Sequence, residues 1–351
     1  KSTTFAVVNE VGAYGRPRVQ TKFIFMTDNK MRTEILNIDK GQCLTDVLPA
    51  IPANTIFDKT ITGCGATHSE IVNAARHSII IEPNIPVILG KKAEHPFLFA
   101  VYEGITKEDV KAYLAGEHDG YRKIITTPEG FDKKVLPAMH ELEIPVYKDY
   151  FLLFDECEKA IQDVGYRGDI YLPVEDFFKF ENKAMVSATP IVPSDPRFEE
   201  NGFKILKLVP TYDSRIELTL CTTNNTVAVM RKLLKRLENE TVCVFLNSTE
   251  TILSLIYALG LQGRSRVFCS EKSVRKLKQI NFTDASETLD ELAPVNFLTS
   301  RFYAAVDIKL DYKPHVILLT DVMRAPFSAV DPQTEAVQIV GRFRNGVEDA
   351  A

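Results

Sequence analysis

Residues 60–70 read TITGCGATHSE, a glycine-rich turn between the strand-like stretch NTIFDK (54–59) and an expected helix. A turn of this kind presents backbone N–H groups to an anion, and the N-terminus of the helix adds a favourable dipole. Gly63 and Gly65 supply the backbone freedom, and Thr67 stands where a phosphate loop places its Mg²⁺-binding hydroxyl. The stretch therefore predicts a phosphate-binding loop in an α/β protein.

The loop departs from the G-x-x-x-x-G-K-[ST] pattern, because Ala66 replaces the lysine and Thr60 replaces the first glycine. Losing that lysine removes a cation from the β- and γ-phosphates, which would abolish hydrolysis unless another positive group enters the site. Lys59 is the candidate to fold back, and its alternative is a solvated residue at a strand end. The residues expected to bind nucleotide are Lys59, Thr60, Gly63, Cys64, Gly65, Ala66, Thr67 and His68.

Outward from the loop, short apolar runs alternate with amphipathic stretches, as in a mainly parallel sheet covered by helices. A first domain is predicted over residues 51–210 and a second over 211–351, with 1–50 as an N-terminal extension of unknown role that includes strand-like TKFIFMT (21–27). The first domain's strands are expected at 77–83, 96–103, 123–128, 150–156 and 184–190. The second domain's strands are expected at 241–248, 265–270, 296–301 and 315–321, with helices at 226–240, 250–260, 273–280 and from about 334.

Composition narrows the function classes. With 351 residues the chain has room for two cores, and no apolar run approaches the roughly 20 residues that span a bilayer. A net charge of −5 argues against coating nucleic acid by bulk attraction, so any such binding depends on placed residues. The six cysteines include no C-x-x-C pair, which indicates reduced thiols and a cytoplasmic location.

Two further motifs follow the loop at expected strand ends. YFLLFDECEKA (150–160) is an apolar strand ending in the carboxylates Asp155 and Glu156, and some thirty residues later comes SATP (187–190). In an α/β sheet, ligand clefts lie at such strand ends. Near the C-terminus, EAVQIVGRFRNG (335–346) has the form Q-x-x-G-R, with a second arginine at Arg344.

In this order, the motifs resemble those of superfamily 2 helicases over about residues 55–346. The resemblance implies two tandem RecA-like P-loop domains that use ATP and Mg²⁺. Asp155 would hold Mg²⁺ together with Thr67, and Glu156 would orient or deprotonate the attacking water. Ser187 and Thr189 would couple nucleotide to nucleic acid.

From the second domain, Gln338, Arg342 and Arg344 would complete catalysis, because guanidinium groups stabilise charge on the transferred phosphoryl oxygens. Arg344 lies one position earlier than the family pattern, with Asn345 in the expected place. The residues expected to contact the nucleic-acid backbone are Asn84, Thr126, Thr127, Thr299 and Ser300.

The resemblance predicts an ATP-dependent helicase or translocase that hydrolyses ATP between two domains and acts on single- or double-stranded nucleic acid. DNA is favoured over RNA because the acidic box reads D-E-C-E. The alternative is a catalytically impaired scaffold that binds nucleic acid or protein partners without turnover, for which Ala66 is the main reason. Membrane association is not expected, and protein partners or further C-terminal domains are left open.

Overall fold

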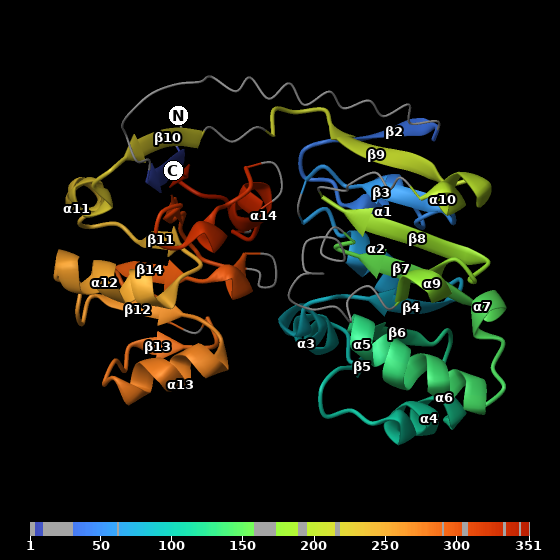
Figure 1. Ribbon diagram of the computed structural model, residues 1–351. Helices are drawn as coiled ribbons and strands as arrows, with labels where there is room; N and C mark the ends of the chain where they lie inside the picture. Colours follow the sequence, from blue (N-terminus) through green and yellow to red (C-terminus); the bar gives the residue numbers. More distant parts are fainter. Residues whose placement is uncertain are drawn as a thin grey trace. The chain divides into compact units, whose positions relative to one another are not determined.

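The computed structural model divides the chain into two compact units, each a parallel sheet flanked by helices (Figure 1). The first unit holds the described residues between Met31 and Ser214. The second holds those from Leu218 onward together with strand β1 (Thr4–Asn9). The structure describes residues 4–9, 31–61, 63–157, 173–188, 195–214, 218–289, 291–303, 308–332, 335–343 and 345–350.

The first unit is built on an eight-stranded sheet, and the pairings between its strands are all parallel. Across the sheet the order is β2 (Thr33–Ile38), β9 (Lys204–Pro210), β3 (Thr55–Asp58), β8 (Asn182–Ser187), β7 (Tyr150–Asp155), β4 (His77–Ile81), β6 (Lys123–Thr126) and β5 (Phe99–Val101). The five strands predicted between residues 77 and 190 are confirmed, each within a few residues.

Alternate residues along the central strands pack into two cores, one on each face of the sheet, because side chains of a strand point to opposite faces. The first core is covered by α4 (Lys107–Ala115), the π-helical turn η1 (Phe131–Val135), α6 (Leu136–Glu141), α9 (Pro173–Phe177) and α10 (Pro196–Glu200). Short α5 (Pro128–Gly130) leads directly into η1. The second core is covered by α1 (Leu44–Val47), α2 (Ala66–Val72) and α3 (Ile85–Glu94). Short α7 (Val146–Asp149) precedes β7.

The second unit repeats this plan with its own eight-stranded parallel sheet. Its order is β1, β10 (Leu218–Thr223), β16 (Asp349–Ala350), β15 (His315–Thr320), β11 (Val242–Phe245), β14 (Val295–Leu298), β12 (Ser265–Phe268) and β13 (Ala285–Ser286), with β1 also pairing β15. Two cores again cover the two faces, with α11 (Thr226–Arg236), α12 (Thr249–Leu259) and α13 (Glu271–Gln279) on one and η3 (Ser300–Phe302) and α14 (Glu335–Gly341) on the other. The predicted α/β fold with two mainly parallel sheets is therefore confirmed.

Within the first fifty residues, which were predicted to be an N-terminal extension, the described strands β1 and β2 belong to the two sheets. Strand β2 pairs with β9 over six residues, from Thr33 opposite Ile205 to Ile38 opposite Pro210. Strand β1 pairs with β10 and β15 in the other unit. The strand-like run 21–27 lies outside the described residues. The units divide at Ser214 and Arg215, a few residues beyond the expected boundary at 210.

A buried ionic network ties α2 to the sheet of the first unit. Glu70 is fully buried, and its carboxylate accepts hydrogen bonds from Arg76 Nε (3.0 Å) and Arg76 Nη2 (2.5 Å) and from the Ser78 hydroxyl. Lys123 Nζ donates to Ser78 Oγ at 2.9 Å and lies 3.6 Å from Glu70 Oε1. The Arg76 guanidinium also stacks 3.4 Å above the ring of Phe151.

No helix of the described residues is long and apolar enough to cross a membrane.

Burial lowers the pKa of Lys123 to about 8, and Arg76 adds to this effect although Glu70 opposes it. Between about pH 8 and 10.5 the unfolded chain therefore binds more protons at Lys123 than the folded chain, so stability rises with pH in this window. We expect Lys123→Met to remove a rise on the order of 2 to 3 kcal/mol. Urea unfolding of the unmodified chain and of Lys123→Met at pH 7.5, 9 and 10.5 measures this rise. If the free energy of unfolding changes equally with pH in both proteins, the prediction is wrong.

Candidate functional site

The carboxyl ends of five neighbouring strands of the first unit bring most of the predicted nucleotide-binding and acidic residues to one edge of the sheet. The order β3, β8, β7, β4, β6 places the ends of these strands side by side. Asp58 pairs with Ser187, Asp155 with Val186, and Ile81 with both Phe154 and Thr126. A single edge therefore carries the glycine-rich loop, the acidic pair and the end of β4.

Hydrogen bonds hold the glycine-rich loop near both of its ends. At its start, Thr60 has a positive φ of 53° and donates from N (3.0 Å) and Oγ1 (3.2 Å) to Asp58 Oδ1. Gly63 and Gly65 have φ of 75° and 88°, a region that disfavours side chains, and α2 begins directly after Gly65. The carbonyl of buried Cys64 accepts from Leu44 N at 2.8 Å.

Lys59 is buried rather than solvated, with 7% of its surface exposed. Its Nζ lies 3.0 Å from Glu156 Oε1 and 3.4 Å from Asp155 Oδ1, and its backbone N donates to Ser187 O at 2.9 Å. Burial by itself would lower the pKa of Lys59, but the carboxylates of Asp155 and Glu156 more than offset this and raise it. The ammonium group is therefore charged and sits between the two acids.

Asp155 also contacts the helix that follows the loop. The Thr67 hydroxyl donates to Asp155 Oδ2, and Glu156 N donates to Asp155 Oδ1 at 3.0 Å. Glu156 has a positive φ of 48°, so the chain turns sharply at the strand end, and Cys157 N then donates to Val186 O at 3.2 Å. Such a conformation is costly for a residue with a side chain and is concentrated at functional sites.

The hydroxyl of Thr67 and the carboxylate of Asp155 are hard oxygen donors in direct contact, which suits Mg²⁺. Magnesium is usually held by one or two protein ligands together with water and substrate phosphates, so this pair is sufficient in number. In the described part of the chain no three His, Cys, Asp or Glu side chains are grouped to hold a metal by themselves. The donor set therefore fits a phosphate-bound Mg²⁺ better than a closed metal site.

Ala66 and His68 do not supply the cation of this cluster. Ala66 is buried at the start of α2. His68 is exposed, and its Nδ1 lies 3.2 Å from Nε2 of His95. The cation beside the acids comes instead from Lys59, seven positions before the usual lysine of such loops.

Glu82 joins the acidic cluster, although the sequence motifs do not single it out. It follows β4, is 1% exposed, and its Oε1 accepts from Asn84 N at 2.9 Å and Asn84 Nδ2 at 3.2 Å. Burial raises the pKa of Glu82 well above its usual value, and Asp155 and Glu156 add to this effect. The sequence does hold a signal for Glu82, because this acid directly follows the apolar run SIII just as Asp155 follows the run YFLLF.

The residues predicted to contact nucleic acid differ in exposure. Thr126 is fully buried and donates from Oγ1 to Thr127 O at 3.1 Å, while Thr127 Oγ1 accepts from Gly130 N at 3.0 Å. An added Cβ at Gly130 would lie 2.5 Å from Thr126 Oγ1, so this turn requires glycine. Both threonine hydroxyls thus shape the turn in this conformation, whereas Asn84 is half-buried at the start of α3.

Most of the remaining predicted residues lie in the second unit. Thr299 is buried and donates to Phe268 O at 3.3 Å, and Ser300 is exposed, with its N donating to Asn247 Oδ1 at 3.4 Å. Gln338 lies in α14 and Arg342 directly after it, and both are largely buried. Arg344 in this unit and Thr189 of the SATP motif lie outside the described residues, and Ser187 is buried.

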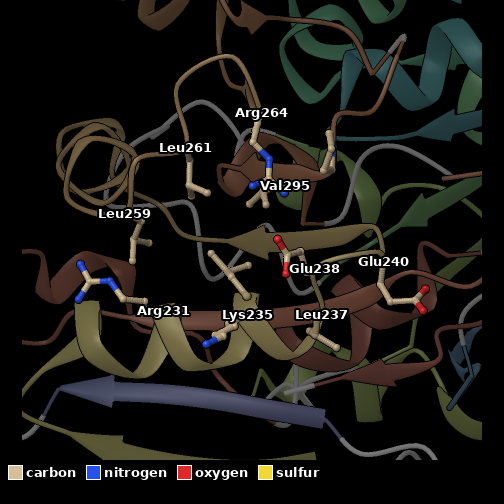
Figure 2. Close-up of a pocket in the computed structure, with 11 residues that line it drawn as sticks. Arg231, Lys235, Leu237, Glu238, Glu240, Leu259, Leu261, Arg264 and Val295 are labelled. Carbon is tan, nitrogen blue, oxygen red and sulfur yellow. The ribbon is translucent and has the colours of Figure 1, made fainter.

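A separate pocket of about 280 Å³ lies in the second unit, beside α11 (Figure 2). Arg264 directly precedes β12 and Val295 begins β14, so the pocket lies at the amino ends of these parallel strands. Thr299, by contrast, follows the carboxyl end of β14. The pocket therefore shares no residue with the predicted site and opens at the opposite edge of its sheet.

No family model and no curated protein matches the chain. Among solved structures, it is similar to S. cerevisiae Dbp5 bound to RNA and ADP BeF3, with 14% identity, a TM-score of 0.51, and coverage of 83% of this chain and 76% of that one. It is similar also to a substituted form of S. cerevisiae Dbp5 bound to a substituted form of Gle1 and to IP6, with 14% identity, a TM-score of 0.52, and coverage of 85% and 77%.

At this identity the likeness is one of fold. The chain shares the fold of these structures, two mainly parallel sheets flanked by helices, which agrees with the predicted tandem RecA-like architecture. The comparisons give no support to the predicted preference for DNA.

Removing the ammonium of Lys59 should destabilise the first unit, because Asp155 and Glu156 would remain buried without their cation. We expect Lys59→Met to cost about 3 kcal/mol at pH 8. The cost should shrink towards pH 5, because unpaired buried carboxyls take up protons more readily in the folded state. Urea unfolding measures it.

The matched control is Lys107→Met, which removes a lysine whose side chain is 37% exposed and pairs with Glu141 on α6. Its effect should stay within about 0.5 kcal/mol. Equal effects of the two substitutions would contradict the role assigned to the buried Lys59.

Proposed function

We propose that the protein is a nucleic-acid-dependent ATPase that works as a helicase or translocase. The observation that carries the proposal is the cluster of Lys59, Thr67, Asp155 and Glu156 beside the glycine-rich loop. A buried cation, two acids and a hydroxyl next to a phosphate-binding turn form a set suited to phosphoryl transfer, whose catalysis consists mainly of positioning and charge stabilisation. The helicase fold supports the same conclusion.

In this proposal the loop from Gly63 to Gly65 and the start of α2 bind the phosphates of ATP. Thr67 and Asp155 would hold Mg²⁺, which when bound supplies positive charge to the phosphate oxygens. Glu156 orients the attacking water and accepts its proton. For this, Lys59 must release Glu156 and turn its ammonium to the phosphates, so the ion pair describes the resting state.

The second unit would contribute Arg342, with Gln338 and Arg344, to complete the charge stabilisation. A guanidinium group presents two N–H donors in one fixed plane to phosphoryl oxygens, whereas the ammonium of lysine is a compact charge without this planar fork. Turnover would then need both units, and changes in nucleotide state would alter the grip on a nucleic-acid strand through Asn84 and Ser300. The strand is held by its backbone, so no base specificity is expected.

The central test is ATP turnover of the full chain with and without single-stranded DNA or RNA. Lys59→Ala should lower turnover about a hundredfold or more, because a cation at the transferred phosphoryl group is lost. Lys59→Ala/Ala66→Lys should regain part of it, because lysine then occupies the usual position in the loop. Lys107→Ala, far from the loop, should have no effect.

Two outcomes would contradict parts of this proposal. Unchanged turnover in Lys59→Ala would show that Lys59 does not replace the missing lysine. Absence of turnover in the unmodified chain would favour the alternative, a scaffold that binds nucleic acid without hydrolysis, which buried Ala66 in the loop supports. A strand-displacement assay then distinguishes a helicase from a nucleic-acid-stimulated ATPase that does not unwind a duplex.

A further inference from the structure

Glu82 lies where the loop expected to contact nucleic acid meets the acidic pair. Its backbone N donates to Thr126 O at 2.9 Å, which continues the pairing of β4 with β6. On the other side, Ile81 pairs with Phe154, so the next residues along the two strands are Glu82 and Asp155. Glu82 thus occupies the same edge position as Asp155, one strand away.

The Glu82 side chain fixes the entry into α3. Its Oε1 accepts both the backbone and the side-chain N–H groups of Asn84, and Asn84 O in turn accepts from Val87 N (3.1 Å) and Ile88 N (3.2 Å) at the start of that helix. Any displacement of the Glu82 carboxyl therefore changes the position of Asn84. Asn84 and the start of α3 therefore follow the position of the Glu82 carboxyl.

A purely structural acceptor for Asn84 would not need to be an acid. Asp155 and Glu156 repel negative charge on Glu82, and Lys59 attracts it. The electrostatic free energy of the buried Glu82 carboxyl therefore depends on where the Lys59 ammonium lies. When Lys59 turns towards phosphates, this balance changes, and the two hydrogen bonds carry the change to Asn84.

We propose that Glu82 is a positioning residue that couples the acidic pair to the Asn84 loop, so that nucleotide and single-stranded nucleic acid change each other's affinity. The inference rests on the proposed function, because it takes nucleotide to bind at the acids and a strand to contact Asn84. Coupling between two binding sites is reciprocal, so it can be measured from either side. Measuring it by binding makes the test independent of turnover.

The experiment compares three variants of the full chain: Glu82→Gln, Glu82→Met and the control Glu141→Met, which removes an exposed carboxylate on α6. Fluorescence anisotropy measures the affinity for labelled single strands of DNA and RNA, with and without a non-hydrolysable ATP analogue and Mg²⁺. In the unmodified chain the analogue should change this affinity about tenfold, within the range usual for coupled sites. Glu141→Met should keep that change.

Glu82→Gln keeps an oxygen that accepts from Asn84 but cannot carry the negative charge, so it should keep the affinity measured without the analogue and reduce the nucleotide-dependent change to within about twofold of none. Glu82→Met has similar length but no acceptor, and should lower both the affinity and the change. If Glu82→Gln or Glu82→Met keeps the full nucleotide-dependent change, the coupling role is wrong. Circular dichroism establishes that each variant is folded.

If Glu82→Met does not fold, Asn84→Ala provides the second test, because it removes one of the two hydrogen bonds and leaves Glu82 in place. The affinity of this variant for the labelled strand should fall both with and without the ATP analogue. The change in affinity that the analogue causes should also become smaller. An unaltered change would overturn the inference. Failure of the proposed function looks different: the unmodified chain would then bind neither strand nor analogue.

Discussion

A buried ammonium group needs anionic partners, and the contact of Lys59 with Asp155 and Glu156 meets this need in the first unit. Three strands are fixed by it, because Lys59 follows β3, the acids end β7, and the Lys59 backbone is hydrogen bonded to Ser187 at the end of β8. Two carboxylates with 1% and 6% of their surface exposed would repel each other without this cation. The loop, the acidic pair and the strand ends therefore form one electrostatic unit.

The parallel sheet makes this arrangement available. Crossover connections return each strand in the same direction, so residues that follow different strands gather at one edge even though Lys59 and Glu156 are 97 positions apart. The same geometry brings Glu82 beside the acids. At the opposite edge, the same parallel order gathers the buried network of Glu70, Arg76 and Lys123, which fixes α2 and is structural.

The displaced lysine gives the site a different resting state from a loop with lysine in the usual place. An ammonium on the loop helix would face phosphates directly, whereas Lys59 comes from the strand and is held by the acids. In the proposed function its release accompanies nucleotide binding, which would link the charge state of the acids to the phosphates. The position of Glu82 extends that link to Asn84, which is why the cluster and the α3 loop are best considered together.

The sequence by itself determined the α/β class, the strands from β4 to β8, the second α/β unit and the strand-end position of Asp155 and Glu156, because apolar runs and glycine-rich turns are local signals. It did not determine that β1 and β2 join different sheets, since strand pairing depends on residues far apart in the chain. The sequence also could not decide whether Lys59 is solvated or buried, and it did not indicate that Thr126 and Thr127 are buried. Only the tertiary structure decides these points, because burial and charge pairing arise when distant strand ends meet.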